Sequence, residues 1–251
     1  MTGFAVLLRK EVAEQWRTAR LPVMVVIFLV VGLGSPLLAK YTPEIVKAAA
    51  GSLPVPIPAP TQRDAIVQLT KNLVQFGAVA AVLLAMGSVA AEKESGTAAF
   101  VLVKPVSRLA FLVAKFSGLL ATLAAAVAAC GAGAYLYTAI LFAAPTAPGF
   151  AAACLLLLLS LLVVAALTFL GSTLTRSSIP AAGVGLAAIA VGATAAAIPN
   201  AGRFSPFGLG GLANDLATGR TADWGWPLVV NLGIVVAALA AAWLVFRRQE
   251  I

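Results

Sequence analysis

Long apolar stretches separated by short polar segments dominate this chain. A helix needs about 20 mainly apolar residues to cross a bilayer. Six stretches approach or exceed that length, at about 21–39, 73–91, 116–142, 150–174, 179–198 and 227–246. They are continuous in Ala, Leu and Val and lack the alternation of polar and apolar residues that is typical of a barrel strand. The pattern therefore predicts an all-α integral membrane protein with six transmembrane helices, in a transmembrane domain over 21–246.

Residues 1–20 precede the first span and have a different pattern. The apolar residues Phe4, Leu8, Val12 and Trp16 recur at helical spacing, and charged residues occupy the other faces. This predicts an amino-terminal amphipathic helix that lies in the cytosolic interface of the membrane. The helix could serve as a membrane anchor alone, or it could also contact a cytosolic partner.

Two segments between spans are expected on the outer side. Alternating prolines within 54–60 exclude helix, and Thr61 and Asp64 have the spacing of a capping box, which predicts a short outer helix leading into the second span. This loop could be a spacer or a docking surface for an extracytoplasmic partner. The segment 199–226 combines Pro and Gly with apolar residues, so we expect short helices half-sunk in the outer interface.

The composition agrees with a membrane protein. The chain is 61% hydrophobic and 10% charged, whereas soluble domains carry about 25% charged residues. Eleven of its 17 Lys and Arg residues lie on the side of the termini, which places both termini, the loop 92–115 and the tail 247–251 in the cytosol beneath the inner (cytoplasmic) membrane. Lipid headgroups, and not nucleic acid, explain the net charge of +8. The first apolar stretch begins too late and is too long for a cleaved signal peptide.

Residues for catalysis or for metal or cofactor binding are scarce. Histidine is absent, no GxxxxGK[ST], HExxH or CxxC motif occurs, and the spans hold essentially no ionisable groups away from their ends. Cys130 and Cys154 lie in apolar stretches, at different depths by this topology, so we interpret them as packing residues. An intramembrane enzyme or a proton-coupled carrier is therefore a poor interpretation, and we expect no cofactor, metal or ATP site in this chain.

The loop 92–115 interrupts the apolar pattern. A charge at the bilayer centre costs about 2.5–3.5 kcal/mol, so Glu92 and Glu94 mark the cytosolic end of the second span, and the third span begins after Lys115. Between them we expect a helix of about two turns, roughly 97–103, which Pro105 ends. Its apolar side chains need lipid or a second protein to cover them.

The stretch "EKESGT" followed by "KPVSRLAFLVAK" resembles the cytosolic loop of type-2 ATP-binding-cassette (ABC) permeases. The matching residues are Glu92, Glu94, Gly96, Thr97, Pro105, Val106, Ser107, Arg108 and Lys115. Ala98 and Ala99 stand where that family usually has Leu-Glu, and Lys104 stands where a small or apolar residue is usual. The number of spans and the amino-terminal amphipathic helix are also similar to that family.

The resemblance implies the permease subunit of an exporter for a hydrophobic or amphipathic substrate. It implies a cytosolic ATPase dimer that holds ATP and Mg²⁺, a second permease subunit, expected to be a copy in a homodimer, and a coupling helix near 97–103. It also implies that the first, second and fifth spans build the dimer contact and the path. The ATPase-binding residues would be Glu92, Glu94, Gly96, Thr97, Phe100, Leu102, Pro105 and Arg108. The alternative is a non-transporting membrane scaffold or sensor that binds a cytosolic regulator through the same loop.

Overall fold

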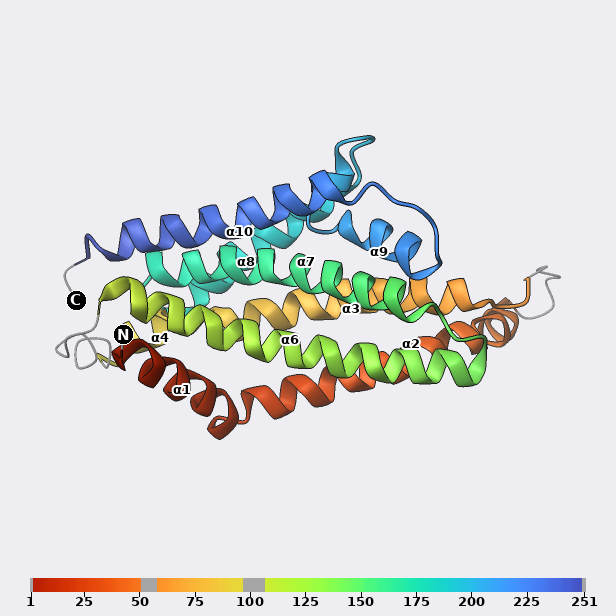
Figure 1. The fold of residues 1–251 in the computed structure, drawn as a ribbon, viewed down its shortest axis with the longest axis horizontal. Coiled ribbons are helices and arrows are strands. Elements are labelled where there is room, and N and C mark those ends of the chain that lie inside the picture. The colour runs from red at the N-terminus through yellow and green to blue at the C-terminus, as the bar shows by residue number, and fades with distance from the viewer. Residues whose placement is uncertain (1, 51–57, 97–106, 250–251) are drawn as a thin grey trace.

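A computed structural model describes residues 2–50, 58–96 and 107–249, and the described part is an elongated helical bundle (Figure 1). Its elements are α1 (Thr2–Arg17), α2 (Arg20–Ala50), α3 (Gln62–Ala85), α4 (Ala90–Glu94), α6 (Arg108–Leu141), α7 (Ala147–Leu174), α8 (Ser178–Ala196), the 3₁₀ turn η1 (Gly202–Phe204), α9 (Leu209–Ala217) and α10 (Gly225–Phe246). The described residues contain no strand. The all-α prediction is therefore confirmed.

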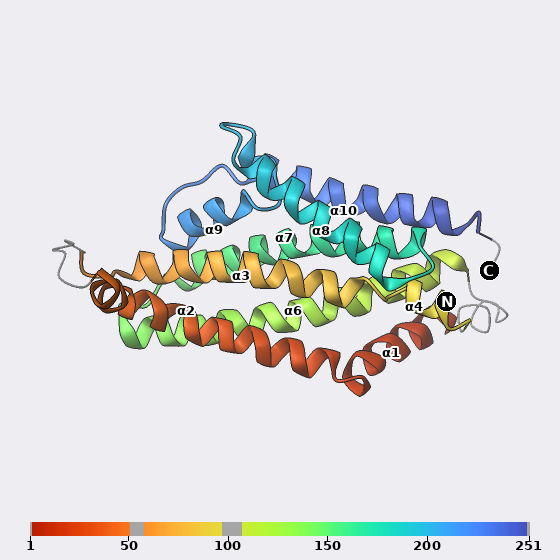
Figure 2. The same ribbon diagram turned by 180° about the vertical axis from the view of Figure 1, so that it is seen from behind.

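Six segments of the described chain are helical, long and apolar enough to cross a membrane. They contain α2, α3 with α4, α6, α7, α8 and α10. The start of α1, α4, the start of α6 and the end of α10 gather at one end of the bundle, and α9 lies toward the other (Figures 1 and 2). Because the number of long helices is even, the first and last elements lie at the same end.

The helix α7 forms the centre of the bundle, where it contacts α3, α6, α8, α9 and α10. It is apolar on all faces, which suits a helix surrounded by other helices. Aromatic rings fill the layer near the end that holds α4. Phe111 stacks on Phe246 with ring centroids 5.6 Å apart, and Phe116 meets the edge of Phe169 at the same separation. These contacts join α6, α7 and α10 into one core.

Several helices extend beyond the spans expected from the sequence. The helix α2 continues to Ala50, through Pro36 and Pro43. The expected outer helix at 61–72 is the first part of α3, and the Thr61 amide donates to Asp64 Oδ2 at 2.8 Å as the capping box requires. A helix that leaves the apolar core of the bilayer can continue into water, so apolar length alone does not define its ends.

The loop expected at 92–115 is described at its two ends, and both ends contain helix. It begins within α4, and α6 starts at Arg108, seven residues before Lys115. Ser107 starts α6 because its Oγ accepts a hydrogen bond from the Ala110 amide at 3.2 Å. The expected coupling helix at 97–103 lies outside the described residues.

The segment 199–226 forms η1 and α9, as expected from its mixed pattern. Leu209 and Ala213 bury one face of α9, and Thr70 Oγ1 of α3 donates to Asn214 Oδ1 at 2.6 Å. The preceding turn packs on α8: a Cβ atom on Gly192 would lie 2.7 Å from the Phe207 ring. Gly192 in the fifth span therefore allows close packing within this chain.

Cys130 and Cys154 are both free thiols. The expectation that they lie at different depths is wrong. Cys154 Sγ lies beside Gly131, the neighbour of Cys130, because a Cβ atom built on Gly131 would be 2.8 Å from that sulfur. Antiparallel packing of α6 on α7 brings Cys130 and Cys154 to similar depths, which the positions of the spans along the sequence do not show.

The helices α2 and α6 approach each other closely at Gly32. A Cβ atom on Gly32 would lie 2.2 Å from the Cys130 carbonyl oxygen, whereas one on Gly34 would have no neighbour within 4 Å. We predict that Gly32→Ala lowers stability by about 1–3 kcal/mol because backbone atoms must move. Thermal unfolding in detergent should then occur about 2–4 °C lower for each kcal/mol.

The matched control is Gly34→Ala in the same helix, which should leave the unfolding temperature unchanged or raise it, because alanine favours helix over glycine. Equal unfolding temperatures for the two variants would contradict the close packing of α2 on α6.

Candidate functional site

The candidate site lies at the base of the segment 97–106, where a buried lysine joins three helices. Lys115 of α6 is 4% exposed, and its Nζ lies 2.6 Å from Glu92 Oε1 of α4. The same Nζ donates to both carboxylate oxygens of Glu11 in α1, at 3.2 and 3.3 Å. The ion pair between Glu92 and Lys115 closes the base of the loop, and Glu11 ties that base to α1.

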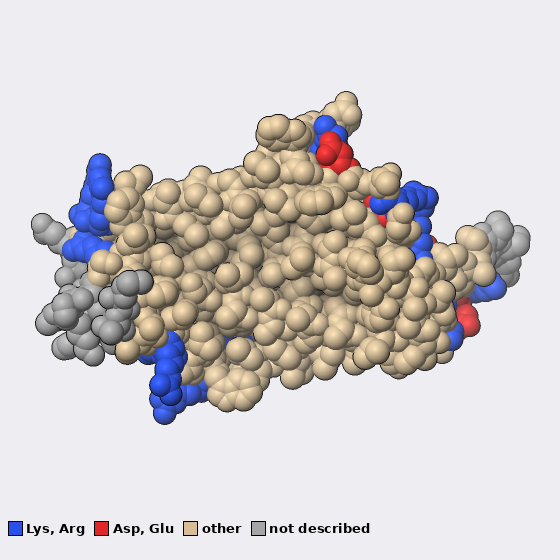
Figure 3. Space-filling model, in the orientation of Figure 1, with Lys and Arg blue, Asp and Glu red and all other residues tan. Residues whose placement is uncertain are grey.

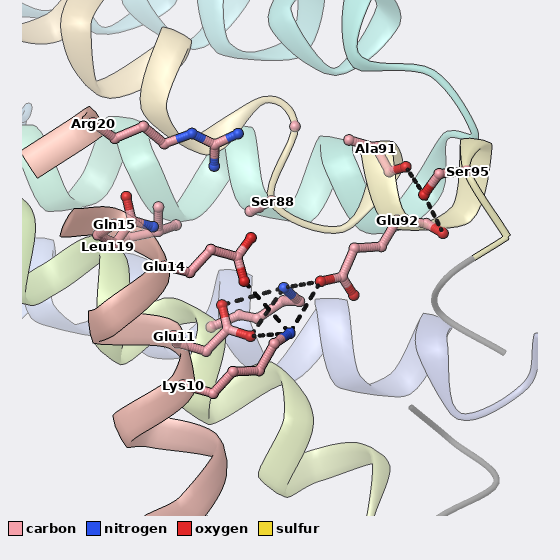
Figure 4. Close-up of a pocket in the computed structure, with 12 residues that line it drawn as sticks. Lys10, Glu11, Glu14, Gln15, Arg20, Ser88, Ala91, Glu92, Ser95 and Leu119 are labelled. Carbon is pink, nitrogen blue, oxygen red and sulfur yellow. Dashed lines mark hydrogen bonds and ion pairs between the residues drawn. The ribbon is translucent and has the colours of Figure 1, made fainter. Parts of the chain in front are cut away.

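Lys10 adds a second cation at the edge of this cluster. Its Nζ lies 3.5 Å from Glu11, 3.4 Å from Glu14 and 3.8 Å from Glu92 (Figure 4). Partial burial acts to lower the pKa of Lys10, but the three carboxylates outweigh it and hold the pKa above its ordinary value. Lys10 therefore remains charged at physiological pH and offsets part of the negative charge of the three carboxylates.

The three carboxylates could also be considered as a metal site, because one oxygen from each lies within 4.8 Å of the others. They line a cavity of about 350 Å³ together with Gln15, Ser88 and Arg20. The ammonium groups of Lys10 and Lys115, however, already contact these carboxylates. Each of the three carboxylates thus has an ammonium group within 4 Å, so we interpret the cluster as an ion-pair network and assign no metal to it.

The helix α1 approaches α6 closely enough to bury Glu11 because Gly118 faces it. A Cβ atom on Gly118 would lie 3.3 Å from Glu11 Cβ. Gln15, one turn further along α1, is also buried against the bundle. A glycine in α6 thus creates the space in which the carboxylate of α1 reaches Lys115.

The turn between α3 and α4 is fixed by α7. Residues 86–89 leave the helix, and Ser172 Oγ accepts hydrogen bonds from the amides of Val89 at 3.1 Å and Ala90 at 2.9 Å. Lys93 Nζ donates to the carbonyl oxygen of Thr173. Two contacts with the end of α7 therefore fix the position of α4.

The start of α6 is fixed by the end of α10. Arg108 Nη1 donates to the carbonyl oxygens of Phe246 at 3.0 Å, Arg247 at 2.9 Å and Gln249 at 2.8 Å. Carbonyl groups at a helix end lack partners in the helix, and a cation there is favoured by the helix dipole. Both sides of the segment 97–106 are thus attached to neighbouring helices.

Comparison with known proteins gives the same family that the loop residues resemble. The model of the family described as ABC-2 family transporter protein matches residues 5–198. This chain belongs to the ABC-2 transporter family. An uncharacterized transmembrane protein, YxlG of Bacillus subtilis (strain 168), is 31% identical over 254 residues, with 97% of each chain covered. ABC-2 permeases are transmembrane subunits of ABC transporters and not ATPases themselves, and the family in general implies a partner ATPase subunit.

The structure divides the expected ABC-2 contact residues into three groups. Glu92 and Arg108 are engaged within the chain, whereas Glu94 and Gly96 are exposed at the end of α4. Thr97, Phe100, Leu102 and Pro105 lie outside the described residues. Glu92 is half-buried beside Lys115, whereas Glu94 is exposed.

The partners of this loop in the ABC-2 chain could not be identified from the sequence pattern. Glu11, Lys10 and Ser172 carry no motif that assigns them to it. The sequence did contain one signal. Glu11 and Gln15 are one helical turn apart, so they lie on the same polar face of the amphipathic helix. Such a face indicates a protein contact, but it does not name the partner.

Replacing Lys115 tests the cluster. We predict that Lys115→Met lowers stability by about 3–5 kcal/mol, because it leaves the carboxylates of Glu11 and Glu92 buried without their shared cation. The methionine keeps most of the side-chain volume, so the loss reports charge and not packing. Thermal unfolding of the purified protein in detergent measures it.

Lys10→Met is the control, since the Lys10 side chain is 46% exposed, and it should cost less than about 1 kcal/mol. Adding Glu11→Gln to Lys115→Met should restore part of the loss. A Lys115→Met protein as stable as Lys10→Met would show that the buried pair is not formed.

Arg108 gives a separate prediction for the end of α10. Arg108→Gln removes the donor to three carbonyl oxygens, so the segment after Phe246 should open more often. Limited trypsin digestion should then cut after Arg247 and Arg248 faster than in the unaltered protein. Arg176→Gln removes an exposed arginine between α7 and α8, near Lys93 of α4, and should leave that rate unchanged. Equal rates for both variants would contradict the capping role.

Proposed function

We propose that this chain is the permease subunit of an ABC exporter that moves a hydrophobic or amphipathic substrate and is driven by a separate cytosolic ATPase pair. The observation that carries the proposal is the attachment of both sides of the segment 97–106. Glu92 and Lys115 bind each other and α1, Lys93 binds α7, and Arg108 binds the end of α10. A force applied to this segment would therefore reach α1, α7 and α10 in addition to α4 and α6, which flank the segment.

The proposed orientation places this end of the bundle in the cytosol, with both termini. The space-filling view supports a transmembrane position, because Lys and Arg lie at the two ends and the middle of the visible face carries none (Figure 3). The end with α4 holds the larger share of basic residues by sequence, which the positive-inside rule assigns to the cytosol.

In the proposed mechanism, ATP and Mg²⁺ bind to the partner ATPase and close it. The segment 97–106 is seated on that ATPase, with Phe100 and Leu102 as the apolar contact and the exposed Glu94 beside it. Closure moves the base of the loop, and the cluster at Lys115 transmits the movement to α1, α4 and α6. The ATPase must bind more favourably to one conformation of the permease, because only a differential affinity can shift the equilibrium.

A second permease subunit completes the proposed transporter, and we propose that it is a copy of this chain. Support comes from apolar side chains that stay exposed on α2 and α8, among them Val26, Val30, Leu186 and Val191. In the bilayer these faces meet either lipid or a neighbouring helix. A homodimer through the first, second and fifth spans would cover part of them and place the substrate path between the copies.

The test replaces residues 96–103 with a flexible linker of equal length. We predict that the variant inserts into the membrane normally but no longer stimulates the ATPase that co-purifies with the unaltered chain. ATP turnover in lipid vesicles, measured with and without the permease, reports the stimulation. The same linker in place of residues 51–57 is the control and should preserve it.

Two outcomes would count against this function. Normal stimulation by the 96–103 linker variant would show that the segment does not couple the two proteins. Co-purification of a regulator without ATPase activity, through the same segment, would favour the scaffold or sensor alternative.

A further inference from the structure

The amphipathic helix α1 faces the bundle with its polar side. Glu11 and Gln15 are each 5% exposed, whereas Val12 is partly exposed and Trp16 is 65% exposed. Two of the four expected apolar positions, Val12 and Trp16, are therefore turned outward, and Phe4 and Leu8 are half-buried. An outward apolar face next to membrane-spanning helices is suited to contact with lipid chains.

A groove runs along this outward face, where α1 meets the start of α2. The chain turns sharply at Ala19, whose φ is +58°, so α1 slopes away from the line of α2 (Figures 1 and 2). Leu8, Val12, Trp16 and Leu21 line the groove, which has a volume of about 640 Å³. That volume lies within the range of about 300–1,000 Å³ that is typical of small-molecule sites.

Two arginines flank the apolar lining. Arg9 and Arg17 both line the groove, two turns apart on α1. Among the described residues neither has a carboxylate partner, because Glu11 and Glu14 contact Lys10 and Lys115 instead. The groove thus combines apolar walls with two exposed cations that can bind an external anion.

We propose that this groove binds an anionic phospholipid of the membrane leaflet that faces α1. Arg9 and Arg17 hold its phosphate and headgroup, and an acyl chain lies along Trp16 and Leu21. The occupant can enter from the bilayer, because α2 lines the groove through Leu21 and exposes the apolar residues Val23 and Val26 just beyond it. The charge of the rim favours an anionic over a zwitterionic lipid, and this site does not depend on the proposed transport function.

Trp16 allows the site to be observed directly. We replace Trp224, Trp226 and Trp243 with Phe, so that Trp16 is the only tryptophan. The protein is placed in phosphatidylcholine vesicles with an equal mole fraction of either brominated phosphatidylglycerol or brominated phosphatidylcholine. Each arginine near an anionic headgroup gives about a fivefold preference, so two give about 25-fold enrichment, and brominated phosphatidylglycerol should quench Trp16 much more strongly.

The charge control compares two double variants that lose the same charge. Arg9→Gln with Arg17→Gln should make the two brominated lipids quench Trp16 equally. Arg203→Gln with Arg220→Gln, at the opposite end of the chain's spans, should leave the difference intact. Equal quenching by both lipids in the protein with all its arginines would overturn the proposal, as would an absence of quenching by either lipid, which would indicate a protein segment in the groove.

A second measurement separates the groove from general attraction of anionic lipid, and it uses the chain with all its tryptophans. Phosphatidylglycerol should raise the unfolding temperature in detergent more than phosphatidylcholine does. Ala13→Phe keeps every charge but fills the groove, since Ala13 lines it, and should abolish that difference. A full phosphatidylglycerol effect in Ala13→Phe would show that the charges act without the groove and would overturn the site.

Discussion

The arrangement of this end of the bundle depends on one buried ammonium group. Lys115 is removed from water, and an isolated charge in such a place is unfavourable by several kcal/mol. Its two carboxylate partners come from parts of the chain 104 and 23 residues away. Because the charge must be neutralised where it is buried, α1 and α4 have to reach the same level of α6. The cost of desolvation thus determines how an amphipathic amino-terminal helix sits against a transmembrane helix.

The same reasoning applies to the backbone groups at this end. In a membrane protein, unpaired backbone amides and carbonyls cannot hydrogen-bond to water within the bilayer. Wherever a helix is interrupted, these groups therefore need a hydrogen-bond partner from the protein. Ser172 supplies it for the turn between α3 and α4, and Arg108 supplies it for the end of α10. These side chains hold the ends of several helices together around the segment 97–106. A loop with so many attachments at its base suits the transmission of force better than a loop that connects two helices only.

The helix α1 has two faces in different surroundings. Its polar strip with Glu11 and Gln15 enters the protein, where Gly118 leaves room and Lys115 provides charge, and its apolar strip with Trp16 faces outward. An ordinary surface helix of a soluble protein has the reverse orientation, with apolar residues inward. The inversion follows from the surroundings, because lipid accepts an apolar face at no cost. It also explains why Arg9 and Arg17, beside that outward face, find no acidic partner within the described part of the chain.

The sequence by itself determined the fold class, the number of long helices and the family resemblance of the loop. Continuous apolar stretches are a local property, so the six long helices could be predicted without coordinates. Only the tertiary structure decided which polar residues meet. Glu11, Lys115 and Ser172 are far apart along the chain, and their contacts follow from how α1, α6 and α7 pack, at positions such as Gly118 where a missing side chain permits close approach. Packing of that kind depends on the shapes of several helices together, so the residue pattern of a single helix cannot predict it.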